Sequence, residues 1–269
     1  MKKILALTLA LGLSASLLAG CGGSGSSSGS ADNAAGSDTE ATAEDSAASE
    51  QLVMATNATF PPYEFVEGGD YEGIDVEIAG KIAEKIGREL KIEDVEFDTL
   101  IGGVQSGKYD MGMAGMTVTE ERKQSVNFSD TYATGIQSVI VPDGSSITTV
   151  DDISSETKIG VQQGTTGDIY ASEDYGDDAV TQYKNGADAV QSLIAGKVDC
   201  VIIDNEPAKS FVEANEGLTI LDTSYAEEDY AICVSKDNEE LLGEINDALG
   251  ELKSDGTIDS IVEKYISAE

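Results

Sequence analysis

The sequence contains no histidine and no tryptophan. Histidine is the commonest metal ligand and general base in proteins, so its absence disfavours a His-ligated zinc site and a Ser-His-Asp hydrolase. Carboxylates and lysines can still perform acid–base chemistry, so other classes of enzyme stay open. We expect a protein that uses neither a metal nor a cofactor.

Basic residues are scarce, with 16 Lys and Arg against 51 Asp and Glu and a net charge of −35. A nucleic-acid-binding surface needs clustered Lys and Arg, so we expect no nucleic-acid partner. We interpret the charge as an acidic, solvated surface, which keeps a protein soluble but does not determine its fold. The 269 residues, of which 40% are hydrophobic, are enough for one large or two small domains.

The apolar run over residues 4–18 is too short for a transmembrane helix, which needs about 20 apolar residues. Because it follows the basic leader Met1-Lys2-Lys3, we expect a signal peptide over residues 1–20. Its end, Leu18-Ala19-Gly20-Cys21, resembles a bacterial lipobox. That resemblance implies a diacylglycerol on Cys21 and an extracytoplasmic protein, lipid-anchored to the outer face of the bacterial cell membrane. The alternative is an ordinary signal peptide with a chance cysteine.

Residues 22–50 consist mainly of Gly, Ser, Ala, Thr and acids, without an aromatic or a basic residue. Such a segment cannot bury enough apolar area to offset its chain entropy, and its like charges repel one another. We therefore expect residues 21–50 to form a lipidated cysteine and a disordered tether, with no fixed structure before Gln51.

Strand and helix signals alternate after the tether, which is typical of an α/β fold with parallel strands. Two prolines in residues 56–65 exclude regular pairing there, so we expect a loop. Ligands of such sheets bind beyond the carboxyl ends of the strands, where Asn57, Phe60 and Phe97 are expected. The expected strands cover 52–55, 90–95, 111–116, 135–141, 158–162, 179–183, 196–204 and 230–234. The expected helices cover 76–86, a stretch from Phe97 capped by Asp98 or Thr99, a stretch from Asp168, 186–195, 238–252 and 258–265.

The stretch 110–132 combines features that suit a small carboxylate ligand. Its apolar strand breaks at Gly115, and Thr119 is placed to cap a short helix whose first turn has free N–H groups. The guanidinium of Arg122 can add two parallel N–H···O bonds, and the hydroxyl of Thr117 lies close by in sequence. The plain alternative is a strand–turn–helix junction whose arginine pairs with a surface glutamate.

Two later strands also end in polar groups. The turn 163–167 leads into a helix and is either an anion site or a plain helix cap, but no Gly-Lys-Ser/Thr follows as in a P-loop. Asp204 ends an apolar strand and is either a ligand-binding acid or the cap of the next helix, because Pro207 favours a helix start there. The helix 186–195 is expected to face inward with Ala189, Leu193 and Ile194.

These stretches resemble the amino-acid-binding family of ABC-transporter solute-binding proteins, family 3. Proteins of this family have a type II periplasmic-binding-protein-like fold. The family pattern T-x-T-x-x-R followed by F-S-x-x-Y stands here at residues 117–122 and 128–132. Its G-[FIL]-D-[VIL] signature stands at residues 73–76 and its near-terminal L-[KR]-x-[DN]-G-T-[ILY] element at 252–258. The resemblance runs from about Met54 to Tyr265.

The resemblance implies an α/β, two-lobed periplasmic-binding-protein-like (type II) fold whose lobes are joined by two hinge strands. Lobe 1 is expected over residues 51–134 and 227–269, and lobe 2 over 135–226. Cys200 and Cys233 would then lie in different lobes, which disfavours a disulfide although the expected compartment permits one. We interpret both as buried, small apolar side chains.

The resemblance also implies a ligand site in the cleft between the lobes. Arg122 would bind an α-carboxylate together with the N–H groups of Thr117 and Thr166. Asp204 would receive the α-ammonium, helped by the carbonyl of Gly115 and the hydroxyl of Thr117. Two aromatic side chains are expected to cover the ligand's side chain: Phe60 and Phe97.

Asn57 occupies a position at which family members that bind basic ligands often have an acid. An amide cannot neutralise a cationic side chain, so Asn57 and the aromatic walls suggest a neutral polar or apolar amino acid. The implied function is that of a monomeric, non-enzymatic receptor that captures a free L-amino acid and delivers it to the transmembrane subunits of an ABC permease. The alternatives are a ligand-sensing module of a membrane receptor and a cleft enzyme similar to cyclohexadienyl dehydratase.

Overall fold

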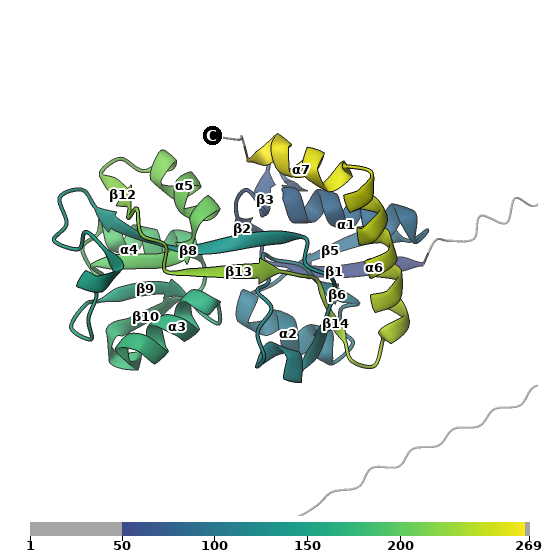
Figure 1. Ribbon diagram of the computed structural model, residues 1–269, viewed down its shortest axis with the longest axis horizontal. Coiled ribbons are helices and arrows are strands. Elements are labelled where there is room, and N and C mark those ends of the chain that lie inside the picture. Colours follow the sequence, from purple (N-terminus) through teal and green to yellow (C-terminus); the bar gives the residue numbers. More distant parts are fainter. Residues whose placement is uncertain (1–49, 267–269) are drawn as a thin grey trace, which may run out of the picture. The chain divides into compact units, whose positions relative to one another are not determined.

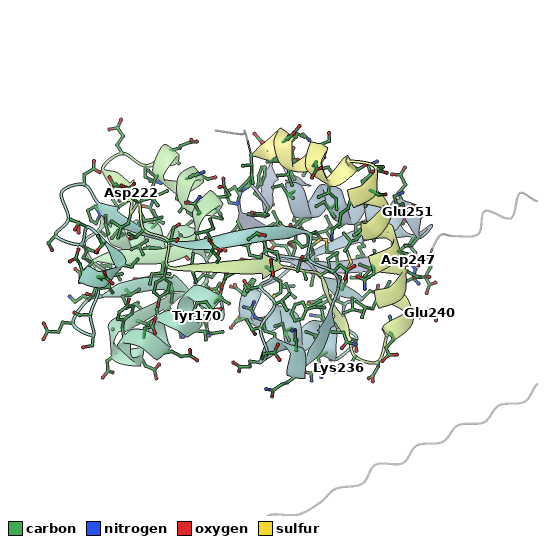
Figure 2. The ribbon with its side chains drawn as sticks, in the orientation of Figure 1. Tyr170, Asp222, Lys236, Glu240, Asp247 and Glu251 are labelled. Carbon is green, nitrogen blue, oxygen red and sulfur yellow. The ribbon has the colours of Figure 1, made fainter. Side chains whose placement is uncertain are left out.

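The computed structural model describes residues 50–266, and Figure 1 shows its arrangement. The expected signal peptide, Cys21 and nearly all of the expected tether lie outside the described residues. Within residues 50–266 no helix has the length and apolarity needed to cross a membrane. Side chains of Glu240, Asp247 and Glu251 are exposed along one long helix (Figure 2), as expected for an acidic, solvated surface.

The first sheet has the strand order β5-β1-β6-β14-β7. Strand β1 pairs in parallel with β5 and β6, as an α/β unit requires, whereas β14 runs antiparallel to its neighbours. The strands are β1 (Gln51–Thr56), β5 (Glu89–Asp94), β6 (Met111–Gly112), β7 (Val126–Phe128) and β14 (Cys233–Ser235). The helices of this part are α1 (Ile74–Lys85), α2 (Phe97–Gln105), α6 (Glu239–Ser254) and α7 (Thr257–Tyr265), with the 3-10 helix η1 (Arg122–Gln124).

Both faces of this sheet are covered, because side chains of a strand alternate between its faces. Leu52 and Met54 of β1 pack in the cluster that includes α1, α6 and α7, while Ala55 packs with α2. Figure 1 shows α1, α6 and α7 together on one side of the sheet and α2 on the other. Burial on both faces explains why this strand reads as a nearly continuous apolar run.

The segment after β1 corrects one expectation. Residues 56–65 were expected to be a loop, but Thr59–Phe60 (β2) pairs antiparallel with Glu64–Glu67 (β3), which pairs with Asp70–Glu72 (β4). The two prolines occupy the turn between β2 and β3, where no ladder N–H is needed, so they do not prevent pairing on either side. This small sheet places Phe60 and Glu64 opposite each other.

The second sheet has the order β10-β9-β11-β8-β12, with β13 also paired to β8. Helices cover both faces of this sheet too, with α4 and α5 on one side and α3 on the other (Figure 1). Its strands are β8 (Ala133–Pro142), β9 (Ile159–Gln162), β10 (Val180–Tyr183), β11 (Cys200–Asp204), β12 (Leu218–Ile220) and β13 (Ala226–Tyr230). Its helices are α3 (Thr166–Tyr175), α4 (Gly186–Ile194) and α5 (Asn205–Ala214), with 3-10 turns η2 (Val150–Asp152) and η3 (Asp177–Ala179).

Strands β8 and β13 connect the two sheets. They pair antiparallel from Ala133 with Tyr230 to Gln137 with Ala226, and Figure 1 shows both running from one sheet towards the other. A further bridge joins Thr117 to Tyr230, so the chain after β6 is attached to the end of β13. The two sheets are therefore joined by two strands that are hydrogen-bonded to each other.

Several local expectations need correction. Helix α2 begins at Phe97 with Glu96 as N-cap, so Asp98 and Thr99 lie inside the helix rather than capping it. Ile194 was expected to face inward, but its side chain is 48% exposed at the last turn of α4. The expectation for the cysteines is confirmed, because Cys200 and Cys233 are both free and buried.

Ile82 and Ile194 form a matched pair for a stability test. Replacing Ile82, which is fully buried in α1, with alanine removes apolar contacts and leaves a cavity, so the free energy of unfolding should fall by about 2–5 kcal/mol. Ile194→Ala at the exposed position should change it by less than about 1 kcal/mol. Urea unfolding followed by circular dichroism measures both values, and equal losses would contradict the assigned core.

Candidate functional site

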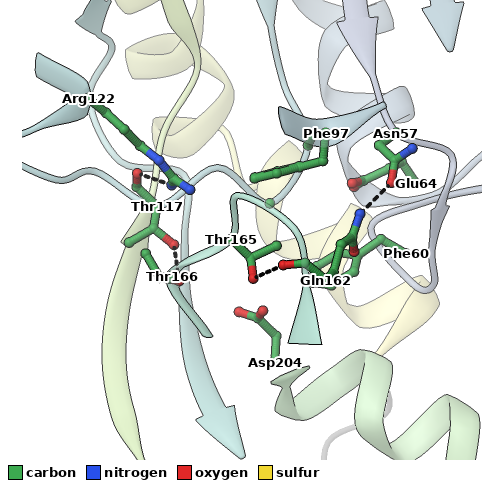
Figure 3. A pocket seen from close by; sticks show the side chains of 12 residues that line it. Asn57, Phe60, Glu64, Phe97, Thr117, Arg122, Gln162, Thr165, Thr166 and Asp204 are labelled. Carbon is green, nitrogen blue, oxygen red and sulfur yellow. Dashed lines mark hydrogen bonds between the residues drawn. The ribbon is translucent and has the colours of Figure 1, made fainter. Parts of the chain in front are cut away.

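One cavity brings together every ligand-binding residue predicted from the sequence. Its empty volume is about 300 Å³, part of which is open to solvent, and Figure 3 shows the side chains around it. The predicted residues that line it are Asn57, Phe60, Phe97, Gly115, Thr117, Arg122, Thr166 and Asp204. Four further lining residues were not predicted: Glu64, Ala114, Gln162 and Thr165.

The position of the cavity follows from the strand directions. Asn57 follows β1, the Gly115 turn follows β6, Thr165 follows β9, and Asp204 is the last residue of β11. The carboxyl ends of parallel strands meet at one edge of a sheet, so loops from both sheets converge on the same space. Residues from both sheets therefore line the cavity.

The guanidinium of Arg122 is buried at the start of η1. Its Nη1 donates to the carbonyl of Thr117 at 2.7 Å and its Nη2 to the carbonyl of Gly164 at 3.0 Å. It also lies 5.5 Å from the centre of the Phe97 ring, and burial lowers its pKa. In the described part of the chain Arg122 forms no ion pair with a surface glutamate, so the plain alternative for this junction is wrong.

Thr119 was predicted to cap a short helix, and it makes a hydrogen bond of that kind. Its hydroxyl accepts a hydrogen bond from the backbone N–H of Arg122 at 3.1 Å, but the turn that follows is a 3-10 helix of three residues with Glu121 as N-cap. The expected helix from Thr119 is therefore replaced by a tighter and later turn. This turn directs the Arg122 side chain back over Thr117 and into the cavity (Figure 3).

Asp204 approaches the same cavity from the second sheet. It occupies the N-cap position of α5, as the cap alternative expected, but its side chain makes no capping hydrogen bond. Its carboxylate accepts a hydrogen bond from the hydroxyl of Tyr230. Burial, reinforced by the negative charge of Glu228, raises the pKa of Asp204 to about 7.

A buried acid on β13 links the segments around the cavity and was missed in the sequence. Oε2 of Glu228 accepts hydrogen bonds from the hydroxyl of Thr117 at 2.9 Å and from the amide of Gln137 at 3.0 Å. The hydroxyl oxygens of Thr117 and Thr166 are 3.5 Å apart. Glu228 lies in the acidic run Glu-Glu-Asp of residues 227–229, which reads as solvent-exposed, so no sequence signal distinguishes it.

Thr166 is the first residue of α3, two residues earlier than the helix start expected at Asp168. The hydroxyl of Thr165 caps this helix by accepting from the backbone N–H of Asp168 at 3.3 Å. The backbone N–H of Thr166 belongs to the first turn and therefore has no acceptor within the helix. It can donate to an anion in the cavity. The helix-cap and anion-site interpretations of this turn are therefore compatible.

Asn57 and Gln162 join the two sheets across the cavity. Nε2 of Gln162 donates to Oδ1 of Asn57 at 2.8 Å, and Nδ2 of Asn57 donates to the carbonyl of Val95 at 2.8 Å. The hydroxyl of Thr59 also donates to Asn57 Oδ1, at 3.0 Å. The amide of Asn57 is thus occupied by protein groups at both ends.

The fold and the cavity define a class of protein: a two-lobed receptor with a small polar site between two α/β sheets. The model of the bacterial extracellular solute-binding proteins, family 3, matches residues 52–268, and the chain belongs to this family. The family resemblance and the two-lobed fold class inferred from the sequence are thereby confirmed.

Named relatives cover most of the chain. The arginine-binding extracellular protein ArtP of Bacillus subtilis (strain 168) is 33% identical over 81% of this chain and 87% of its own length. The ABC transporter glutamine-binding protein GlnH of the same strain is 33% identical over 100% of this chain and 99% of its own. The structure of an ancestral arginine-binding protein bound to arginine has a TM-score of 0.77 at 39% identity, covering 82% of this chain and 100% of that one.

The raised pKa of Asp204 predicts a pH dependence of stability in the ligand-free protein. Its pKa rises from 3.8 to about 7 on folding, so the folded protein holds more protons than the unfolded chain between these values. Stability from this group is present below about pH 4 and is lost as the pH rises to about 7. Asp204→Asn removes this contribution and should make the decline from pH 4 to 8 shallower by the order of a few kcal/mol.

Urea unfolding at several pH values measures this slope. The exposed Asp247→Asn is the matched control, and it should keep the wild-type slope because its carboxylate is solvated in both states. A wild-type slope in Asp204→Asn would show that this carboxyl does not titrate near neutral pH in the folded protein.

Proposed function

We propose that this protein captures a free L-amino acid in the cavity between its sheets and delivers it to an ABC permease. One observation supports this most strongly: the cationic Arg122 and the acidic Asp204, brought from different sheets, line the same cavity. Opposite charges at two places in a small cavity match the carboxylate and ammonium of one amino acid. The names of the relatives, which bind arginine or glutamine, support the same class of ligand.

Each end of the amino acid has a proposed set of partners. Arg122 binds the α-carboxylate with the backbone N–H groups of Thr117 and Thr166. Asp204 binds the α-ammonium with the carbonyl of Gly115 and the hydroxyl of Thr117. A buried charge is costly unless it is paired, so both ends need dedicated partners. Two rings cover the rest of the ligand: Phe60 and Phe97.

The proposed mechanism is closure of two lobes about β8 and β13, with lobe 1 over residues 51–134 and 227–269 and lobe 2 over 135–226. Direct contacts between the lobes support a closed form in this structure. Lys184 pairs with Glu96 at 3.1 Å, and Gln162 bonds to Asn57. A ligand that contacts both lobes binds the closed form better than the open form and shifts the balance towards closure.

The proposal extends to the setting of the receptor. We infer a monomer that is anchored outside the membrane by a lipid on Cys21, because residues 18–21 match a lipobox, and that hands its ligand to permease subunits. We also infer that the protein binds without turnover, since its relatives are transport binding proteins. An unchanged ligand recovered after long incubation would support binding alone, and a new product would identify an enzyme.

Removing the guanidinium tests the carboxylate subsite. Arg122→Ala leaves the ligand carboxylate buried without its charged partner, so affinity should fall by about 2–5 kcal/mol. Titration calorimetry with the amino acid that gives the largest thermal shift in a screen of the twenty measures the loss. Arg88→Ala, which removes the other arginine far from the cavity, is the control. If Arg122→Ala bound every amino acid as wild type does, the assignment would be refuted.

Removing the charge of Asp204 tests the ammonium subsite. Asp204→Asn should weaken amino acids by about tenfold or more, because a desolvated ammonium loses its charged acceptor, and should weaken the matching deaminated acids much less. Competition calorimetry with each pair of ligands measures the two losses. Equal losses for both members of a pair would show that Asp204 does not contact the amine.

A further inference from the structure

Glu228 is a buried acid that lies beside the cavity without lining it. It is part of β13, its exposed fraction is 6%, and it is not among the described residues of the cavity wall. Both hydrogen bonds to its Oε2 come from uncharged donors, the hydroxyl of Thr117 at 2.9 Å and the amide of Gln137 at 3.0 Å. Any effect of Glu228 on a ligand must therefore pass through a residue of the wall or through its own charge.

The hydrogen bond between Thr117 and Glu228 has a fixed direction. A carboxylate has no proton to donate, so the hydroxyl of Thr117 is the donor. With its one proton committed to Glu228, the oxygen of Thr117 can only accept further hydrogen bonds. The hydroxyl oxygen of Thr166 is 3.5 Å away, which is long for a hydrogen bond, so Thr117 keeps acceptor capacity towards the cavity that it lines.

The backbone around Thr117 is held on both sides. The carbonyl of Thr117 accepts from Nη1 of Arg122 at 2.7 Å, as Figure 3 shows, and the backbone N–H of Val118 donates to the carbonyl of Asp229 at 3.0 Å. The direction of the hydroxyl proton is what remains variable at Thr117, and the bond to Glu228 sets it.

An oxygen that only accepts hydrogen bonds suits one end of the proposed ligand. An ammonium has donors and no acceptor, whereas a carboxylate has acceptors and no donor. A hydroxyl that rotates freely could bind either end, because it can donate or accept. The direction that Glu228 imposes on Thr117 therefore distinguishes the ammonium of an amino acid from its carboxylate.

We propose that Glu228 is a positioning residue of the ammonium subsite: by taking the hydroxyl proton of Thr117, it keeps the oxygen of Thr117 as an acceptor for the α-ammonium of the ligand. The inference rests on the proposed function and adds to it a residue that does not touch the ligand. Gln137 on β8 donates to the same carboxylate oxygen, so both strands that connect the sheets contribute to the arrangement. The role requires an acceptor within reach of Thr117 and requires no negative charge there.

The charge of Glu228 is the other route by which it could act on the ligand. A negative charge attracts an ammonium, but this charge also reinforces the effect of burial that raises the pKa of Asp204 to about 7. It thereby favours a proton on the proposed direct partner of the ammonium. These two effects of the charge oppose each other near neutral pH, so we expect the direction of the Thr117 hydroxyl to dominate.

The first test separates the reach of the side chain from its charge. Glu228→Asp keeps the charge but withdraws the carboxylate from Thr117 by one methylene, so amino-acid affinity should fall at least about tenfold. Glu228→Gln loses the charge, but its amide oxygen can occupy the place at which Thr117 and Gln137 both donate, so affinity should stay within about threefold. Titration calorimetry with the amino acid that gives the largest thermal shift among the twenty measures both values.

The matched controls are Glu227→Asp and Glu227→Gln, which change an exposed acid of the same strand and should bind as wild type does. A loss in Glu228→Gln as large as that in Glu228→Asp would assign the effect to charge and overturn the inference. Wild-type affinity in Glu228→Asp would overturn it as well. If no amino acid binds the wild-type protein, the proposed function fails and this role fails with it.

The second test separates positioning from a general structural role. Glu228→Asp should weaken the matching deaminated acid by less than about threefold, because that ligand has no ammonium. In a double-mutant cycle with Thr117→Val, which has no hydroxyl, the further loss of amino-acid affinity from Glu228→Asp should also be less than about threefold. The cycle needs only the amino acid, so it decides the question even where the deaminated acid binds too weakly to measure.

Equal losses for the two ligands, or additive losses in the cycle, would show that Glu228 supports the fold rather than the hydroxyl of Thr117. Either result overturns the inference and leaves the proposed function intact. Glu228→Ala, which removes the same hydrogen bond, takes the place of Glu228→Asp in both tests if that variant does not fold, and the same outcomes apply to it.

Discussion

The structure depends on holding two opposite charges at the wall of one small cavity. Arg122 donates to the carbonyls of Thr117 and Gly164 and lies over the Phe97 ring, and Asp204 accepts from the hydroxyl of Tyr230. Dipoles stabilise a buried charge less than an opposite charge does. The protein is thus left with two buried groups that a zwitterion would satisfy better than the protein does. In the proposed function this deficit is the source of affinity.

The deficit also explains why the site is divided between two halves of the chain. If one rigid lobe held both groups, they could relax towards each other and pair. Placing Arg122 after one sheet and Asp204 at the end of a strand in the other lets the backbone keep them apart. In the proposed closure β8 and β13 act as the hinge, and Glu228, which lies on β13 and accepts a hydrogen bond from Thr117, connects the hinge to the site.

Much of this arrangement could be predicted from the sequence, because strand ends and motifs are local features. The alternation of apolar strands and helices indicated an α/β fold, and the rule that ligands bind beyond strand ends pointed to Asn57 and Phe97, which both line the cavity. Arg122 could be found because a short motif surrounds it. Element boundaries were less accurate: the prolines after β2 were read as excluding strands, although they only mark the turn between two of them.

The residues that were missed share one physical feature, which is that their burial depends on distant parts of the chain. Glu64 follows two prolines and reads as a surface residue, but β4 and α1 enclose it. Glu228 sits among other acids in the sequence, but Thr117 and Gln137, from other segments of the chain, donate hydrogen bonds to its buried carboxylate. Gln162 is one polar residue at the end of a strand, and only its bond to Asn57 in the other sheet shows that it spans the cavity.

The number of buried acids is the last constraint that the architecture must satisfy. Glu64, Asp75, Asp204 and Glu228 all lie in or beside the cavity, whereas Arg122 is the only cation that lines it. Four carboxylates around one guanidinium would repel one another, and burial raises the pKa of Glu64, Asp75 and Asp204, which favours their protonated forms when the site is empty. In the proposed function the α-ammonium of the ligand supplies the positive charge that Asp204 lacks in the empty site, so binding of the amino acid favours the ionised form of this carboxyl.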